Sequence, residues 1–82
     1  MTLTDEIKQL VKNYVGPLGE IFLRKQCDII HADIENLTIE DLKKLIPLIE
    51  KNSVLLCGKG KSMELKNGLE AILTKYSGGE KI

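Results

Sequence analysis

Hydrophobic side chains recur along the chain with the period of an α-helix. A first helix is predicted over about residues 4–14, with Thr4 as its N-cap, from the spacing of Ile7, Leu10, Val11 and Tyr14. Gly16-Pro17 ends this helix, because the residue before a proline is driven out of helical geometry and proline suits the first turn of the next helix.

The next segment, residues 17–31, is predicted to be a helix that is apolar over most of its circumference. One side carries Leu18, Ile21, Phe22 and Ile29, and a second side carries Leu23, Cys27 and Ile30. A helix with so little polar surface has to be surrounded by other elements. We therefore expect it at the centre of the fold.

A further helix is predicted to begin at Thr38, where Asp41 can complete a capping box. Its apolar face is Leu42, Leu45, Ile46 and Ile49. Pro47 lies within this pattern and removes a hydrogen bond, so the helix is expected to bend there. The apolar run 54–57 is expected to be buried, and it has no second strand with which to pair.

Gly58-Lys59-Gly60-Lys61 is predicted to be a loop, and Ser62 the N-cap of a last helix whose apolar face ends at Tyr76. The predicted fold is all-α, a compact bundle of four to five short helices around the central helix at about 17–31. Residues 1–76 form the single domain, and 77–82 form a flexible C-terminal tail.

Composition narrows the function classes. The 82 residues include 12 basic and 12 acidic side chains and few aromatic ones, which argues against a nucleic-acid-binding role. The charge is uneven, because residues 1–41 carry four basic and eight acidic side chains and residues 42–82 carry eight and four. The polar, acidic N-terminus and the absence of a long apolar run predict a cytoplasmic protein that does not enter a membrane.

The stretch Gly60-Lys61-Ser62 before a predicted helix resembles the end of a phosphate-binding P-loop. Leu55 stands where that motif requires its first glycine, so a nucleotide triphosphatase is not expected. A weaker hypothesis remains, in which backbone N–H groups and lysines bind a small anion or a nucleotide phosphate at Gly58, Lys59, Gly60, Lys61 and Ser62.

Neither catalysis nor a metal site is predicted. Cys27 and His31 are four residues apart on the central helix, and Cys57 is a third potential ligand, but the Cys-x-x-Cys pairs of structural zinc sites are absent. Cys27 lies on the apolar side, where a thiol is inert. We expect no catalytic residues, no metal ligands and no cofactor.

Two short motifs carry a resemblance. Val15-Gly16-Pro17-Leu18-Gly19 is similar to the Val-Gly-Pro helix start of a small helical module appended to bacterial and archaeal signalling proteins such as response regulators and kinases. A later segment of that module, Leu-Thr-x-Glu-Asp-Leu, resembles residues 37–42. The resemblance implies a non-catalytic interaction or regulatory module.

The leading hypothesis is therefore an adaptor that binds another protein or a second copy of itself. Lysines are candidate contacts for an acidic partner, and three apolar residues not needed for the core are further candidates. These partner-binding candidates are Lys43, Lys44, Lys59, Lys61, Ile34, Ile39 and Leu48. The alternatives are the anion sensor and, more remotely, nucleic-acid binding through the lysine-rich second half.

Overall fold

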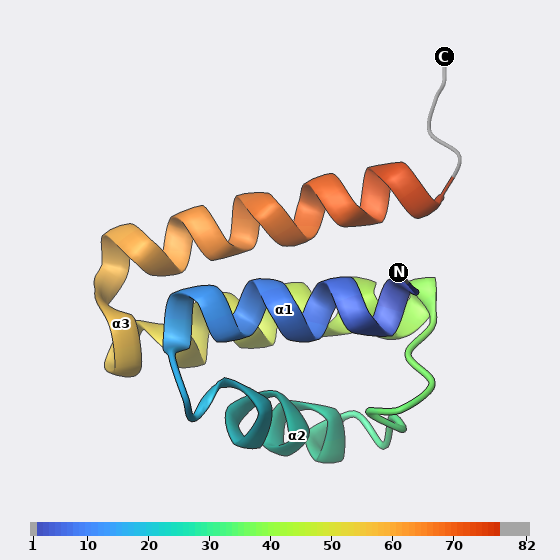
Figure 1. The fold of residues 1–82 in the computed structure, drawn as a ribbon, viewed down its shortest axis with the longest axis horizontal. Helices are drawn as coiled ribbons and strands as arrows, with labels where there is room; N and C mark the ends of the chain where they lie inside the picture. Colours follow the sequence, from blue (N-terminus) through green and yellow to red (C-terminus); the bar gives the residue numbers. More distant parts are fainter. Residues whose placement is uncertain (1, 78–82) are drawn as a thin grey trace.

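The computed structural model describes residues 2–77, and these residues form three helices. They are α1 (Leu3–Val15), α2 (Gly19–Ile29) and α3 (Ile39–Tyr76), and α3 is folded back on itself (Figure 1). The predicted all-α class is confirmed. The predicted number of four to five helices is wrong, and most of the tail predicted at 77–82 lies outside the described residues.

Helix α1 begins one residue earlier than predicted, and its N-cap lies two residues earlier. Thr2 is the N-cap, and its side chain accepts a hydrogen bond from the backbone N–H of Asp5 at 3.1 Å. Thr4, the expected cap, is buried inside the helix, where its hydroxyl oxygen accepts the N–H of Leu37 at 2.9 Å. It thereby ties the connection between α2 and α3 to α1. Gly16 ends α1 at φ 93°, as its place before proline predicted.

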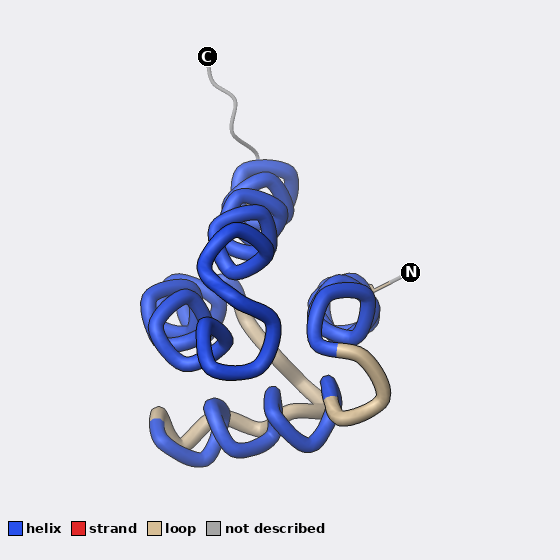
Figure 2. Tube along the Cα trace, turned by 90° about the vertical axis from the view of Figure 1, so that its left-hand side faces the viewer, coloured by secondary structure: helices blue, strands red, loops and turns tan. Residues whose placement is uncertain are grey.

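Helix α2 crosses beneath α1 and the first part of α3 (Figure 2). It approaches α1 closely, because a Cβ atom on Gly19 would lie 2.7 Å from the Cα of Lys12. The prediction that the segment 17–31 is the central, surrounded helix is wrong. Leu18, Ile21 and Ile29 are each more than half exposed, since α2 is packed from one side only.

Helix α3 begins with the predicted capping box. The Thr38 side chain accepts the N–H of Asp41 at 3.1 Å, and the Asp41 carboxylate accepts the N–H of Thr38 at 3.1 Å. The backbone keeps helical angles through Pro47, so the helix does not end or restart at that residue. Pro47 and Lys43 are both exposed, so water can reach the Lys43 carbonyl that the proline leaves without its helical partner.

The break in α3 falls at Gly58, the one residue of 39–76 with non-helical backbone angles (φ 86°, ψ 162°). It divides the helix into an N-terminal arm (residues 39–57) and a C-terminal arm (residues 59–76), which lie side by side and antiparallel (Figures 1 and 2). The loop predicted at 58–62 is therefore wrong. A single glycine reverses the chain, because its backbone angles lie in a region that other residues rarely enter.

The C-terminal arm lies over α1 and the N-terminal arm and runs along both of them (Figures 1 and 2). All three helices and the connection before α3 contribute to one core, whose buried apolar side chains are Ile7, Val11, Phe22, Leu23, Cys27, Ile34, Leu37, Leu42, Leu45, Ile46, Ile49, Leu65 and Leu69. Gly68 lets the C-terminal arm rest against the Leu10 side chain of α1. Within residues 2–77, no helix combines the length and hydrophobicity that crossing a bilayer requires.

Candidate functional site

Four large apolar side chains gather around the reversal of α3. Leu55 is 91% exposed, Leu56 51%, Met63 42% and Val54 39%. The expectation that the run 54–57 is buried is therefore wrong. The reversal forms one end of the molecule, beyond the ends of α1 and α2, so no other described helix reaches across to cover it (Figure 1).

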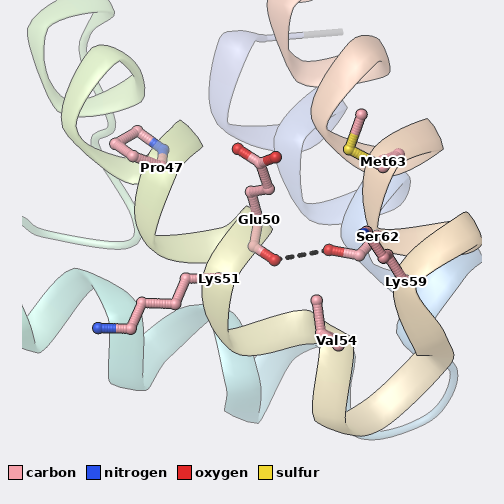
Figure 3. Close-up of a pocket in the computed structure, with 7 residues that line it drawn as sticks. All are labelled: Pro47, Glu50, Lys51, Val54, Lys59, Ser62 and Met63. Carbon is pink, nitrogen blue, oxygen red and sulfur yellow. Dashed lines mark hydrogen bonds between the residues drawn. The ribbon is translucent and has the colours of Figure 1, made fainter.

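A cavity of about 250 Å³ lies beside this exposed run, between the two arms of α3 (Figure 3). We call it the arm groove. Its lining is largely apolar, and the charged side chains add their methylene stems to it. The N-terminal arm contributes Pro47, Glu50, Lys51 and Val54, and the C-terminal arm contributes Lys59, Ser62 and Met63.

Two buried serines hold the arms together at the base of the arm groove. The Ser62 hydroxyl donates to the backbone carbonyl of Glu50 at 2.6 Å (Figure 3) and lies 2.7 Å from the Ser53 hydroxyl. Because the single proton of Ser62 is used toward Glu50, the Ser53 hydroxyl is the donor in the serine pair. Both serines are almost fully buried, so they set the spacing between the arms. Ser62 is thus an internal clamp and not the predicted N-cap.

The rim of the arm groove is positively charged. Glu50 is already paired, since its carboxylate lies 3.7 Å from the Lys66 ammonium. Lys51 and Lys59 are exposed, and neither takes part in an ion pair among residues 2–77. The groove therefore combines an apolar interior with two uncompensated cations.

The structure disperses most of the predicted partner-binding residues. Lys59 is the only one of them that lines the arm groove. Lys43 pairs with Glu40 at 3.4 Å, whereas Lys44 and Lys61 are exposed and outside any ion pair of the described chain.

The predicted apolar contacts are less accessible than expected. Ile34 is 5% exposed and belongs to the core, because the connection before α3 folds against α1. The expectation that Ile34 is not needed for the core is therefore wrong. Ile39 and Leu48 are half-buried. Sequence reasoning missed Leu55, Leu56 and Met63, although the apolar run directly before Gly58 was a usable signal.

The predicted anion-binding residues do not form a loop. Lys59, Gly60 and Lys61 lie on the first turn of the C-terminal arm with their side chains exposed, and Ser62 on the same turn points inward to Glu50. The residues of the anion hypothesis therefore lie at the start of a helical arm and not in a separate loop.

The three potential metal ligands lie in different surroundings, because His31 is exposed whereas Cys27 is buried and Cys57 is half-buried. Cys27 is buried in the core, and burial, followed by the negative charge of Asp41, raises the pKa of its thiol to about 11. Cys57 is half-buried, and its sulfur donates to the carbonyl of Ser53 at 3.3 Å. Within residues 2–77, no three histidine, cysteine, aspartate or glutamate side chains are grouped as metal ligands.

Comparison of the chain with protein-family models, with curated proteins and with solved structures gave no match.

Proposed function

We propose that this chain is a non-catalytic protein-binding module, an adaptor whose contact surface is the arm groove together with Leu55 and Leu56. The observation that carries the proposal is the concentration of exposed apolar side chains around the reversal of α3. Apolar side chains on a protein surface are usually scattered, and a contiguous group beside a concave site is typical of an interaction surface.

The energetics favour a partner that covers Leu55. Burying a leucine side chain that is otherwise in water contributes about 1.5–3 kcal/mol, and Leu55 is nearly fully in water. Met63 and Val54 add partly exposed area on either side of the cavity. A few such central side chains typically carry most of the binding energy of an interface.

The fold holds the arm groove in one conformation before a partner binds. The serine pair and the ion pair between Glu50 and Lys66 hold the two arms of α3 in register. The groove is therefore formed before a partner arrives, and binding does not have to offset the ordering of these side chains.

Site-specific photo-crosslinking tests the proposal. A photoreactive residue is placed at Leu55 in one variant and at Ile21, which is 57% exposed on α2, in a matched control. In cells of the source organism we expect a discrete adduct from position 55 that position 21 does not give. The adduct protein is then purified and titrated against the wild-type chain and Leu55→Ser.

Loss of binding by Leu55→Ser, with binding retained by Ile21→Ser, is the expected result. Leu55 is exposed and outside the core, so its replacement by serine leaves the fold intact, which circular dichroism checks. Identical adducts from both positions, or equal affinity of both variants for the purified protein, would overturn the assignment of this surface.

A further inference from the structure

We infer that the arm groove binds an amphipathic helix of a partner protein whose apolar face is flanked by aspartate or glutamate. This inference rests on the proposed function and names the chemistry of the partner. It is argued from the shape of the groove and from the charges that surround it.

The shape of the groove fits a helix. The N-terminal arm lines it from Pro47 to Val54, which is a length of about 10 Å at 1.5 Å per residue, or two helical turns. Both walls are α-helices, so along the groove there is no strand edge to which an extended peptide could add. A third helix can rest between two antiparallel ones by placing its side chains in the furrow between them.

The apolar part of the occupant follows from the lining. Val54 lines the groove from the N-terminal arm near the reversal, Met63 lines it from the C-terminal arm, and Pro47 lies farther along the N-terminal arm (Figure 3). Two turns of helix present apolar side chains to such a furrow at positions i, i+3 or i+4, and i+7. Leu55 and Leu56 extend the apolar surface beyond the groove.

The exposed lysines near the groove indicate that the flanks of the bound helix are acidic. Lys44, Leu48, Lys51 and Leu55 follow one another at i, i+4, i+7 and i+11, so cations and apolar side chains alternate along one face of the N-terminal arm. Lys59 stands on the opposite wall of the groove. None of these three lysines has an ion-pair partner among residues 2–77. Lys51 extends from the N-terminal arm away from the C-terminal arm (Figure 3), so carboxylates on the outer flank of a bound helix would be the ones to meet its ammonium.

A second copy of this chain is a poorer occupant. Apart from the apolar side chains around the reversal of α3, its most exposed apolar helix face is that of α2, where Ile21, Lys25 and Ile29 are spaced four residues apart and lie on one side. That face would bring the ammonium of Lys25 against Lys51 and Lys59, which is unfavourable. Self-association through the groove is therefore one of the outcomes that the test must be able to reveal.

The test is a selection from displayed random peptides of about 16 residues, long enough for four helical turns. The bait is the folded full chain, and selection is run in parallel on Lys51→Glu/Lys59→Glu and on the control Lys12→Glu/Lys25→Glu. The control makes the same change of charge at exposed lysines of α1 and α2 that are also outside any ion pair of residues 2–77.

On the wild type and on the control, we expect enriched peptides with apolar residues at helical spacing and an excess of aspartate and glutamate. A peptide enriched in this way should bind Lys51→Glu/Lys59→Glu at least tenfold more weakly, and the difference should shrink as salt is raised. Chemical-shift changes should fall on residues lining the groove, and the peptide should become helical when bound.

Enrichment of neutral or basic peptides, no enrichment, or unchanged affinity for Lys51→Glu/Lys59→Glu would overturn the inference. A dimer in sedimentation that Leu55→Ser dissociates would overturn it in favour of a second copy. The proposed function fails separately, by the absence of a Leu55-specific adduct. A purified partner could instead bind Lys51→Glu/Lys59→Glu as tightly as the wild type and yet fail to bind Leu55→Ser. That result would agree with the proposed function and would refute the inference that the partner helix is acidic.

Discussion

Ser53 and Ser62 face each other in the interior of the molecule with their hydroxyl oxygens 2.7 Å apart, although both belong to α3. In an uninterrupted helix, two residues separated by nine positions lie on opposite faces, because each residue turns the helix by about 100°. The reversal at Gly58 is what brings them together. The same reversal brings Val54 and Met63 to the lining of one cavity and so creates the arm groove.

The serine pair should behave as one unit in stability measurements. Ser62→Ala removes the donor to the Glu50 carbonyl and leaves the buried Ser53 hydroxyl without its acceptor, so we expect a loss of about 1–3 kcal/mol in the free energy of unfolding. Ser53→Ala, Ser62→Ala and the double variant form a cycle that urea unfolding can measure. We expect the double variant to lose less than the sum of the single ones, and strict additivity would show that the pair does not interact.

Gly58 and Gly60 form a matched pair for testing the reversal. Gly58 has φ 86° and ψ 162°, where a side chain is strained even in open space, so Gly58→Ala should destabilise the fold by about 1–3 kcal/mol. Gly60 is helical and a Cβ there meets nothing within 4 Å, so Gly60→Ala should be neutral or stabilise by up to about 1 kcal/mol. Thermal unfolding of both variants checks the contrast. Equal effects would show that the strain at position 58 is not what distinguishes the two glycines.

The two cysteines should differ in reactivity. Cys57 is half-buried near the surface at the reversal, whereas Cys27 is in the core with a pKa raised to about 11. At pH 7.5 a maleimide should label one thiol per folded chain and two in denaturant. Mass spectrometry of the labelled peptides identifies the site, and rapid labelling of Cys27 in the folded chain would contradict its burial.

The raised pKa of Cys27 also predicts a dependence of stability on pH. The unfolded thiol loses its proton from about pH 9, while the folded one holds it to about pH 11. The contribution of Cys27 to stability is therefore complete below pH 9 and should decline by about 1–2 kcal/mol as the pH rises toward 11. Cys27→Ala should show no such decline from this position, and a wild-type curve parallel to that of the variant would refute the assignment.

Glu6 on α1 should give the opposite dependence at acid pH. The Tyr76 hydroxyl and then the Lys75 ammonium donate to its carboxylate and hold the pKa of Glu6 below its usual value of 4.5. Its contribution to stability is present above that value and is lost as the pH falls through the lowered folded pKa. In Tyr76→Phe, the carboxyl resonance of Glu6 should titrate at a higher pH than in the wild type, and Tyr14→Phe serves as the control.

Local signals that act over one or two helical turns predicted the structure well. Thr38 and Asp41 form their capping box, because both members and the backbone groups they bind lie within four residues. Gly16 ends α1 for an equally local reason. The apolar faces of both arms are buried, since Leu45 and Leu65 have no exposed area.

Sequence patterns whose outcome depends on tertiary packing around a helix led to wrong predictions. Residues 17–31 are apolar on two sides, and that pattern predicted a helix surrounded by other elements. In the structure, other elements pack against α2 from one side only. Pro47 was expected to bend α3, but the break in the helix falls at Gly58, and Pro47 lies on the exposed side of the N-terminal arm. The candidate site was missed for a related reason, because exposure of Leu55 depends on the absence of any element beyond the reversal.

The sequence by itself determined the helical class, the capping box at Thr38 and the end of α1 at Gly16, because these depend on interactions between residues a few positions apart. Only the tertiary structure decided which apolar side chains stay in water and which lysines stand beside them. The hydrophobic effect is non-directional, so any apolar surface can cover an apolar helix face. A periodic pattern therefore indicates that a face is apolar but not which element covers it. In this protein the arm groove exists because Gly58 brings two faces of one helix together.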